Sequence, residues 1–385
     1  MEEELWQDIA KCLSPKGYLW AGYPKYRRLF GRDSLIAAWQ LLKTRPAISR
    51  VTLMALAKYQ GWTVDPKREE EPGKILHEHY DGGLLQQIRD LSWSRLRQYL
   101  TWGFPYYGSI DSTAWWLILL SRFFQRTGDR TFICWLWTNV FSALQWIERY
   151  GDVDADCFIE YRRKNRHALL HQGWKDGLQM SISQPVAMVE VQGYYYLAYL
   201  EIAALAGEVM QDRHAKAWLE EKAASLKEKF NAAFWVEERE FFALALDGQK
   251  EQVATITSNP GHLLFTGIVD YEKEVKIVRR LFADDMWTPY GIRTHSASDH
   301  CFDAASYHQG SIWPHDNWII YVGLKERGYH QEAETVKQAL IRAYKTLGCM
   351  PELYGVENNR LFYISTACCP QAWASGALLN LLTEK

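Results

Sequence analysis

The chain has 385 residues and a formal net charge of −2, and it contains 18 Trp and 22 Tyr. The near-neutral balance excludes a chain-wide basic field for nucleic acid or anionic lipid. The acidic amino-terminus lacks the segments of a signal peptide, and no apolar run approaches the roughly 20 residues of a membrane span. Seven cysteines without a CxxC pair are typical of reduced thiols in a cytoplasmic enzyme. We therefore expect a cytoplasmic protein with no nucleic-acid or membrane partner.

Hydrophobic periodicity predicts helices along the whole chain. The segment 112–127 is apolar nearly all round, with Asp111 before it as a candidate cap and Gly128 as a stop. The segment 212–234 instead has one apolar stripe, so buried inner and one-sided outer helices coexist. The predicted helices lie near 2–13, 33–43, 46–60, 112–127, 131–150, 186–207, 212–234, 260–270, 272–283, 316–326, 330–347 and 369–383.

Long loops separate some of these helices, at 61–110, 151–184 and 284–315. They hold most of the Gly, Pro and His residues, and such long connections in compact domains are usually functional. A strand at 240–246 followed by Asp247-Gly248 is a candidate short β-hairpin. No linker divides the chain, so we predict one domain over 1–385. Its predicted class is all-α, an (α/α)6 barrel with long rim loops. The helix pattern alone also fits an irregular array, and the clustering of loop chemistry favours the barrel.

Several kinds of active site lack their motifs. The chain has no GxxxxGK[ST], no GxGxxG after a strand, no HExxH and no GxSxG. The densest histidine sites, His77/His79 and His308/His315, have no carboxylate or thiol partners at metal-binding spacings. We therefore expect no metal and no cofactor.

Carboxylates in aromatic, glycine-rich loops remain as candidates. Those that begin predicted helices, Asp33, Asp111 and Asp316, can serve as caps. Asp33 can also pair with the adjacent Arg32. Glu78 lies in another of these loops. Asp176 and Glu352 have no capping role, which makes them the best pair of catalytic groups.

Hydrolysis of a glycosidic bond needs one protonated and one ionised carboxyl group. Trp174 is expected to raise the pKa of Asp176 as an apolar wall, whereas Lys175 lowers it if it points the same way. Aromatic rings also stack on sugar faces. The sequence does not give the carboxyl separation, so this reasoning leaves the stereochemical outcome open.

Ten collinear motifs resemble the catalytic domain of the amylo-α-1,6-glucosidase (glycogen-debranching-like) family. They are LFGRDSLI (29–36), EEEPGKILHE (69–78), YYGSIDST (106–113), HQGWKDG (171–177), VEVQGYYYLA (189–198), SNPGHLL (258–264), YGIRT (290–294), YHQGSIWPHDN (307–317), PEL (351–353) and CPQAWA (369–374). Related barrels are the inverting α-glucosidases and the mannosylglycerate and glucosylglycerate hydrolases. The resemblance implies an (α/α)6 barrel and glycoside hydrolysis.

The resemblance also implies roles for single residues. Asp176 matches the general acid and Glu352 the general base of an inverting enzyme, with carboxyls about 6.5–9.5 Å apart. The implied walls of the sugar pocket are Arg32, Asp33, Tyr307, Gln309 and Trp313, with Trp174 as a stacking residue. Further candidates for substrate contact in the same motifs are His77, Glu78, Asp111, Lys175 and His308.

Two departures bear on the substrate. Many debranching-like relatives have serine where this chain has Gly177, and they carry an amino-terminal β-rich domain before the barrel. We therefore expect a small glycoside or short oligosaccharide, cleaved at its terminal glucosyl unit by an exo-acting α-glucosidase. Two alternatives stay open: a sugar-binding barrel without catalysis, and a sugar isomerase that uses pocket histidines. The sequence leaves the oligomeric state open.

Overall fold

The computed structural model describes residues 1–80, 98 and 100–384. Its α-helices are α1 (Glu2–Cys12), α2 (Gly31–Gln40), α3 (Pro46–Lys58), α6 (Ser112–Thr127), α7 (Arg130–Trp146), α8 (Val189–Glu208), α9 (Arg213–Ala233), α10 (Leu263–Thr266), α11 (Tyr271–Leu281), α12 (Pro314–Glu326), α13 (His330–Leu347) and α14 (Ala372–Thr383). A π-helical turn, η1 (Ile147–Gly151), extends α7, and a 3-10 turn, η3 (Asn259–His262), precedes α10.

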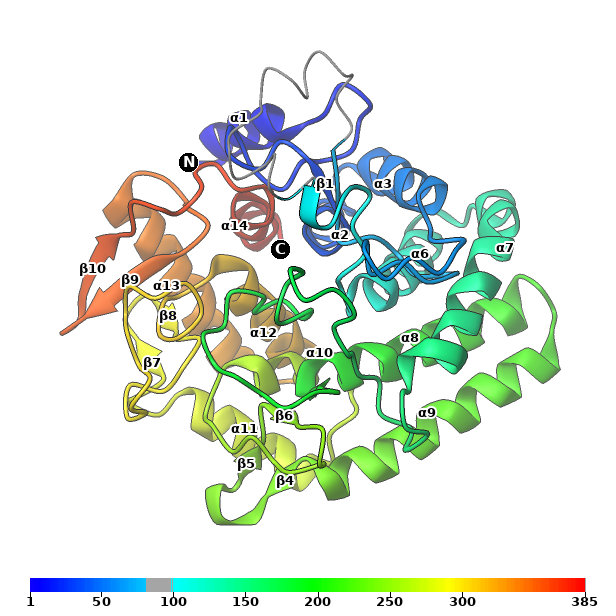
Figure 1. Cartoon of the computed structure of the whole chain (residues 1–385). Helices are drawn as coiled ribbons and strands as arrows, with labels where there is room; N and C mark the ends of the chain where they lie inside the picture. The colour runs from blue at the N-terminus through cyan, green and yellow to red at the C-terminus, as the bar shows by residue number, and fades with distance from the viewer. Residues whose placement is uncertain (81–97, 99, 385) are drawn as a thin grey trace.

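The helices form two concentric rings (Figure 1). In the inner ring each helix packs against the next, in the order α2, α6, α8, α10, α12 and α14, and α14 closes the ring on α2. Outside it, α3 packs on α2 and α6, α7 on α6, α9 on α8, α11 on η3, α13 on α12 and α1 on α14. The predicted (α/α)6 barrel is confirmed.

The sequence separates the two rings correctly. In α6 the residues from Ser112 to Ser121 are all buried, as expected for an inner helix. In α9 a narrow stripe is buried, which includes Leu219, Ala223, Leu226 and Phe230. A helix with one apolar stripe can bury only that side against a neighbour, so it lies on the outside.

The loops contain short antiparallel strand pairs. They are β1 (Leu29–Phe30) with β2 (Glu78–His79), β3 (Ala187–Met188) with β6 (Ala245–Leu246), β4 (Trp235–Val236) with β5 (Phe241–Phe242), β7 (Trp287–Thr288) with β8 (Gly291–Ile292), and β9 (Tyr354–Glu357) with β10 (Arg360–Tyr363).

The predicted hairpin at 240–248 is corrected in its pairing. The segment 240–246 holds two separate strands, β5 and β6, that pair with different partners. Asp247 and Gly248 do form a turn, and beyond it Gln252 bridges back to Leu246 while Val253 exchanges backbone hydrogen bonds with Leu244 and Ala245. The pairing of β3 with β6 also explains why α8 begins at Val189, three residues later than predicted, because residues 187–188 are extended.

The amino-terminal ends of inner helices converge on one side of the barrel. One cavity is lined by residues from three of these helix ends. They are Arg32 and Asp33 in the first turn of α2, Trp313 before α12, and Gln371 and Trp373 at the start of α14. Helix amino-termini carry partial positive charge and free N–H groups, so this end of the barrel favours carboxylates. Among the described residues, no helix is both long and apolar enough to cross a membrane.

Candidate active site

A cavity of about 750 Å³, measured with its open mouth, lies where these helix ends meet. Four carboxylates face it: Asp33, Glu78, Asp176 and Glu352. The other lining residues are Arg28, Arg32, His77, His308, Gln98, Gln371, Leu169 and the aromatic residues Tyr26, Phe30, Trp102, Trp174, Tyr307, Trp313 and Trp373. Acidic groups enclosed by aromatic rings are suited to a ligand with hydroxyls and C–H faces, as in a sugar.

Arg32 fixes the position of Asp176. Its Nη1 donates to both carboxylate oxygens of Asp111, at 3.1 and 2.9 Å, while Nη2 lies 3.2 Å from Oδ2 of Asp176. Asp111 in turn accepts a 2.7 Å hydrogen bond from the hydroxyl of Ser109. A planar guanidinium with several donors can join two carboxylates in this way. Arg32 therefore connects α2, the start of α6 and the loop 171–177.

Asp176 is poised to carry a proton near neutral pH. Its side chain is 24% exposed, toward the cavity. Loss of hydration raises the pKa of Asp176 to about 6, against the lowering effect of the Arg32 guanidinium. The negative charges of Asp111, Glu352 and Glu78 raise this pKa further.

Glu352 is held by hydrogen bonds at both oxygens. The hydroxyl of Tyr307 donates to Oε1 at 2.5 Å, and the backbone N–H of Cys368 donates to Oε2 at 3.0 Å. Burial raises the pKa of Glu352, while these two hydrogen bonds and the charge of Lys25 act in the opposite direction. Donors directed at both oxygens stabilise the ionised form.

Asp33 is a further carboxyl with an altered proton affinity. Burial raises the pKa of Asp33 to about 7, and Arg32, whose Nε lies 3.9 Å from Oδ1, offsets part of that effect. The N-cap residues of α2 and α12 are Phe30 and Trp313, so Asp33 and Asp316 lie inside the first turns; Asp111 is the N-cap residue of α6, but its side chain accepts no capping hydrogen bond. The predicted capping roles are corrected: Asp111 binds Arg32, and Asp316 accepts a 2.7 Å hydrogen bond from His262.

His308 binds the loop 171–177 at Gly177. The N–H of Gly177 donates to Nδ1 of His308 at 3.1 Å, which requires that nitrogen to be unprotonated. Burial lowers the pKa of His308 well below its usual value, in agreement with this role. A Cβ on Gly177 would lie 3.0 Å from Cδ1 of Tyr307 and 3.2 Å from Nδ1 of His308. Glycine at 177 therefore allows the close approach of Tyr307.

Of the residues predicted to contact substrate, three lie outside the cavity lining. Asp111 accepts hydrogen bonds from Arg32 and does not itself line the cavity. Lys175 is 1% exposed and donates to the carbonyl of Thr294 at 2.5 Å, so it points away from Asp176. Gln309 accepts a 3.3 Å hydrogen bond from the N–H of Gln179. The cavity is lined by the other predicted residues: Arg32, Asp33, His77, Glu78, Trp174, Asp176, Tyr307, His308, Trp313 and Glu352.

Other lining residues were not predicted. Gln371 and Trp373 lie within the CPQAWA motif, which could have pointed to them because it joins the barrel's last inner helix. Tyr26 and Arg28 precede the GRD motif, and Arg28 donates a 2.6 Å hydrogen bond to Glu78. No sequence signal marks Trp102 or Leu169.

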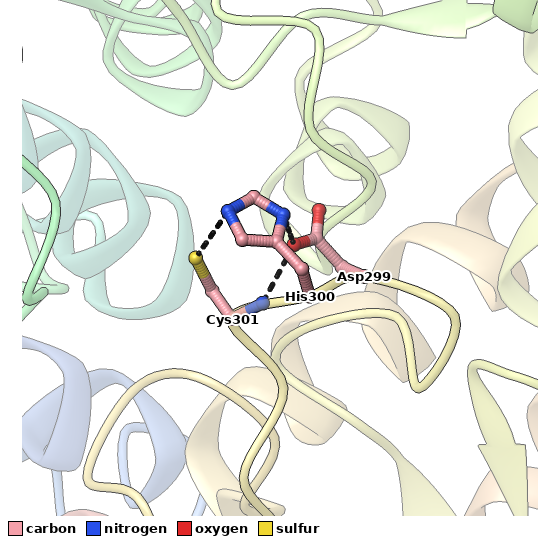
Figure 2. A group of neighbouring side chains, drawn as sticks. All are labelled: Asp299, His300 and Cys301. Carbon is pink, nitrogen blue, oxygen red and sulfur yellow. Dashed lines mark hydrogen bonds and ion pairs between the residues drawn. The ribbon is translucent and has the colours of Figure 1, made fainter.

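Two clusters of candidate metal ligands lie away from the cavity. In the first, shown in Figure 2, Nδ1 of His300 lies 3.1 Å from Asp299 and Nε2 lies 3.1 Å from the thiol of Cys301. The two nitrogens of one ring thus serve two neighbours, on a loop where the His300 side chain is 91% exposed. These contacts are those of a surface hydrogen-bonded turn.

The second cluster consists of Asp152, Asp154 and Asp156, and the side chain of Lys250 supplies a positive charge to it. The ammonium of Lys250 lies 2.9 Å from Asp154 and 2.6 Å from Asp156. Asp152 accepts backbone N–H groups of residues 156 and 157.

Known glycoside hydrolases match parts of this sequence. Residues 154–354 match the model of the mannosylglycerate hydrolase MGH1-like glycoside hydrolase domain. The mannosylglycerate hydrolases MGH2 and MGH1 of Selaginella moellendorffii are each 35% identical over 77 residues, which is 20% of this chain and 15% of either relative.

Solved structures share the whole fold. The GH63 mannosylglycerate hydrolase from Thermus thermophilus in complex with glucose aligns with a TM-score of 0.77 at 14% identity, over 100% of both chains. The same hydrolase in complex with Tris and D-glycerate aligns with a TM-score of 0.76 at 14% identity, again over 100% of both chains.

Proposed function

The chain belongs to the mannosylglycerate hydrolase MGH1-like glycoside hydrolase family, and from this premise we propose that it is an exo-acting, inverting hydrolase of small glycosides. The observation that carries the proposal is the pair Asp176 and Glu352, which face one cavity in different environments. The sequence resemblance placed such hydrolases among the relatives of the debranching-like family. An amylo-1,6-glucosidase activity stays a prediction of that resemblance.

In the proposed mechanism Asp176 is the general acid. With a pKa of about 6, a usable fraction of Asp176 is protonated near neutral pH, and exclusion of water by a bound sugar raises that fraction. Asp176 gives its proton to the glycosidic oxygen as the bond to the anomeric carbon breaks. Arg32 then stabilises the carboxylate that forms, because its Nη2 is already 3.2 Å from Oδ2.

Glu352 is the proposed general base. Its ionised oxygens, oriented by Tyr307 and the N–H of Cys368, remove a proton from water as the water attacks the anomeric carbon from the opposite face. The proton bound by Glu352 leaves to solvent after the reaction, and Asp176 is reprotonated from solvent. The configuration at the anomeric carbon inverts, and a carboxyl separation of about 6.5–9.5 Å is expected for this geometry.

For the substrate we propose a glycoside of one sugar with a small aglycone. The cavity of about 750 Å³ suits a short ligand, and the relatives in plants and Thermus thermophilus are mannosylglycerate hydrolases. A glycosylglycerate is therefore the first candidate. A small α-glucoside is the second, because the debranching-like motifs of this chain imply a glucosyl unit.

The isomerase alternative rests on His77 and His308, which both line the cavity. Burial lowers the pKa of both residues well below its usual value. His308 already uses Nδ1 to accept the N–H of Gly177, which supports a structural role. The acid–base demands of the site are better met by the carboxyl pair.

A single experiment tests the function. The purified chain is incubated with mannosylglycerate, glucosylglycerate, isomaltose and maltotriose, and the anomeric protons of the products are followed by NMR. We expect a free monosaccharide whose first-formed anomer is opposite in configuration to the substrate. A product that retains the configuration would refute the inverting mechanism. Binding without any release would favour a non-catalytic sugar-binding barrel, and conversion of a free sugar to its isomer would favour the isomerase.

A further inference from the structure

A second cavity lies behind the loop that carries Asp176. It encloses about 870 Å³, measured with its mouth, and shares no lining residue with the first cavity. Its walls come from residues 69–74, Ile110, the end of α7 with η1, the pair Asp152 and Val153, and the segment 160–164. Gln172 also lines it, four positions before Asp176.

Two of the residues that line this cavity, Glu160 and Gln172, each hold a buried hydrogen-bond acceptor without a partner in the described part of the chain. Glu160 and Gln172 are each 1% exposed. Oε2 of Glu160 accepts a 2.8 Å hydrogen bond from Lys250, while Oε1 has no partner among the described residues. The amide nitrogen of Gln172 donates to Glu69, while its Oε1 likewise has no partner in the described part of the chain. Buried acceptors without donors are costly, so a ligand that supplies hydroxyl donors gains affinity there.

The interior charges of the cavity are already matched. Glu69 accepts the N–H groups of Lys164 and Asn165 at 2.8 and 2.7 Å. Glu71 accepts a 2.7 Å hydrogen bond from the indole of Trp146 and pairs with the ammonium of Lys164. These acids therefore hold the walls together and are not available to attract a cation.

The mouth is basic. Arg149 and Arg162 are both exposed and line the cavity, and within residues 1–80, 98 and 100–384 neither guanidinium makes a hydrogen bond or ion pair. Asp152 also lines the cavity, and its carboxylate accepts the backbone N–H groups of residues 156 and 157. A guanidinium with all its donors free is a strong binder of phosphate or carboxylate.

We propose that this second cavity binds a small polyhydroxylated anion, with its anionic group on Arg149 and Arg162 and its hydroxyls donating to Glu160 and Gln172. Sugar phosphates and hydroxy acids share this chemistry. The backbone carbonyl of Gln172 accepts the N–H of Ile110 at 2.9 Å, next to the Asp111 that holds Arg32. A ligand seated on Gln172 therefore restrains the loop of Asp176 from the side opposite to the first cavity.

Isothermal titration calorimetry on the full chain tests the site independently of any catalysis. The probes are D-glucose 6-phosphate and D-glycerate, with D-glucose and inorganic phosphate as probes that each lack half of the proposed chemistry. We expect at least one of the first two to bind, more tightly than glucose or phosphate, and more weakly at high salt. The response to each of the first two distinguishes a sugar phosphate from a hydroxy acid.

Variants locate the binding. The double variant Arg149→Gln/Arg162→Gln is expected to weaken it tenfold or more, because both charged donors are lost. Arg213→Gln, an exposed arginine on α9, is the matched control and should leave it unchanged. Trp313→Ala in the first cavity should also leave it unchanged. Absence of binding by both probes, binding that the double variant leaves unaltered, or loss of binding in Trp313→Ala would each overturn the proposal. Glucose that binds the first cavity as a product of the proposed reaction is recognised by its loss in Trp313→Ala.

Discussion

The phenolic oxygen of Tyr307 lies 2.5 Å from Oε1 of Glu352, although the two residues are 45 positions apart in the chain. The other oxygen of Glu352 accepts the N–H of Cys368. A carboxylate held at both oxygens keeps one orientation and favours its charged form. In the proposed mechanism this arrangement suits Glu352 to accept a proton although burial raises its pKa, and it suits Asp176, whose pKa is raised to about 6, to give one.

Removal of that phenol tests the orientation of Glu352. Tyr307→Phe is expected to lower kcat by roughly 10- to 100-fold, the effect of one lost hydrogen bond to a charged group. Because the hydrogen bond stabilises the ionised form, its loss raises the pKa of Glu352 and moves the acidic limb of the pH profile of kcat/KM to higher pH. Tyr321→Phe, whose hydroxyl instead bonds Glu384 at 2.8 Å, is the matched control. An unchanged acidic limb in Tyr307→Phe would contradict the assigned role of Glu352.

The activity of two variants on different leaving groups distinguishes the proposed acid from the proposed base. Asp176→Asn should reduce hydrolysis of a glycoside with an alkyl aglycone by about 10²–10⁴-fold, the usual contribution of proton transfer. The same variant should be much less impaired on a glycosyl fluoride, whose leaving group needs no proton to depart. Glu352→Gln should be impaired on both, because water still has to be activated. Steady-state rates on the two substrates give the comparison, and equal losses in Asp176→Asn on both would remove Asp176 as the acid.

Glu78 tunes Asp176 through charge. The negative charge of Glu78 is one of the causes that raise the pKa of Asp176. Glu78→Gln removes that charge, so the pKa of Asp176 falls, and the protonated acid is lost at a lower pH. We expect the alkaline limb of kcat/KM to move down by several tenths of a pH unit. Glu237→Gln in the exposed turn after β4 is the control. A shift of this limb to higher pH would show that the charge acts differently.

The sequence predicts the helices well because the barrel is built from their patterns. Each of the twelve predicted helices overlaps an observed helix, since each has an apolar stripe or an apolar surface that must be buried against a neighbour. One error occurs where a glycine ends a helix early. Residues 260–270 were predicted as one helix, but η3 and the short α10 end at Gly267, whose φ of +74° stops the helix.

The sequence marks the loops that carry the candidate site residues, but it does not show which side chains contact one another. The motif of residues 171–177 marks Asp176, and a glutamate outside any helix marks Glu352. The hydrogen bond from Arg32 to Asp111, across 79 positions, depends on how inner helices meet. So does the direction of Lys175, which the sequence left open and which the structure turns toward Thr294. Such contacts follow from packing of distant segments, which periodicity does not encode.

Asp33 gives a test of stability with a defined sign. Its carboxyl has a pKa of about 7 in the folded chain, above the roughly 3.9 of an unfolded aspartate. The folded state therefore binds this proton more tightly, so the contribution to stability is complete below about pH 4 and is lost as pH rises toward 7. Asp33→Asn mimics the neutral acid and removes this loss. We expect Asp33→Asn to raise the free energy of unfolding by about 1–3 kcal/mol at pH 8, and by clearly less at pH 5. Denaturant unfolding at both pH values measures the difference, with the exposed Asp284→Asn as control. A gain of equal size at the two pH values would mean that the substitution acts through packing and that Asp33 carries no raised pKa.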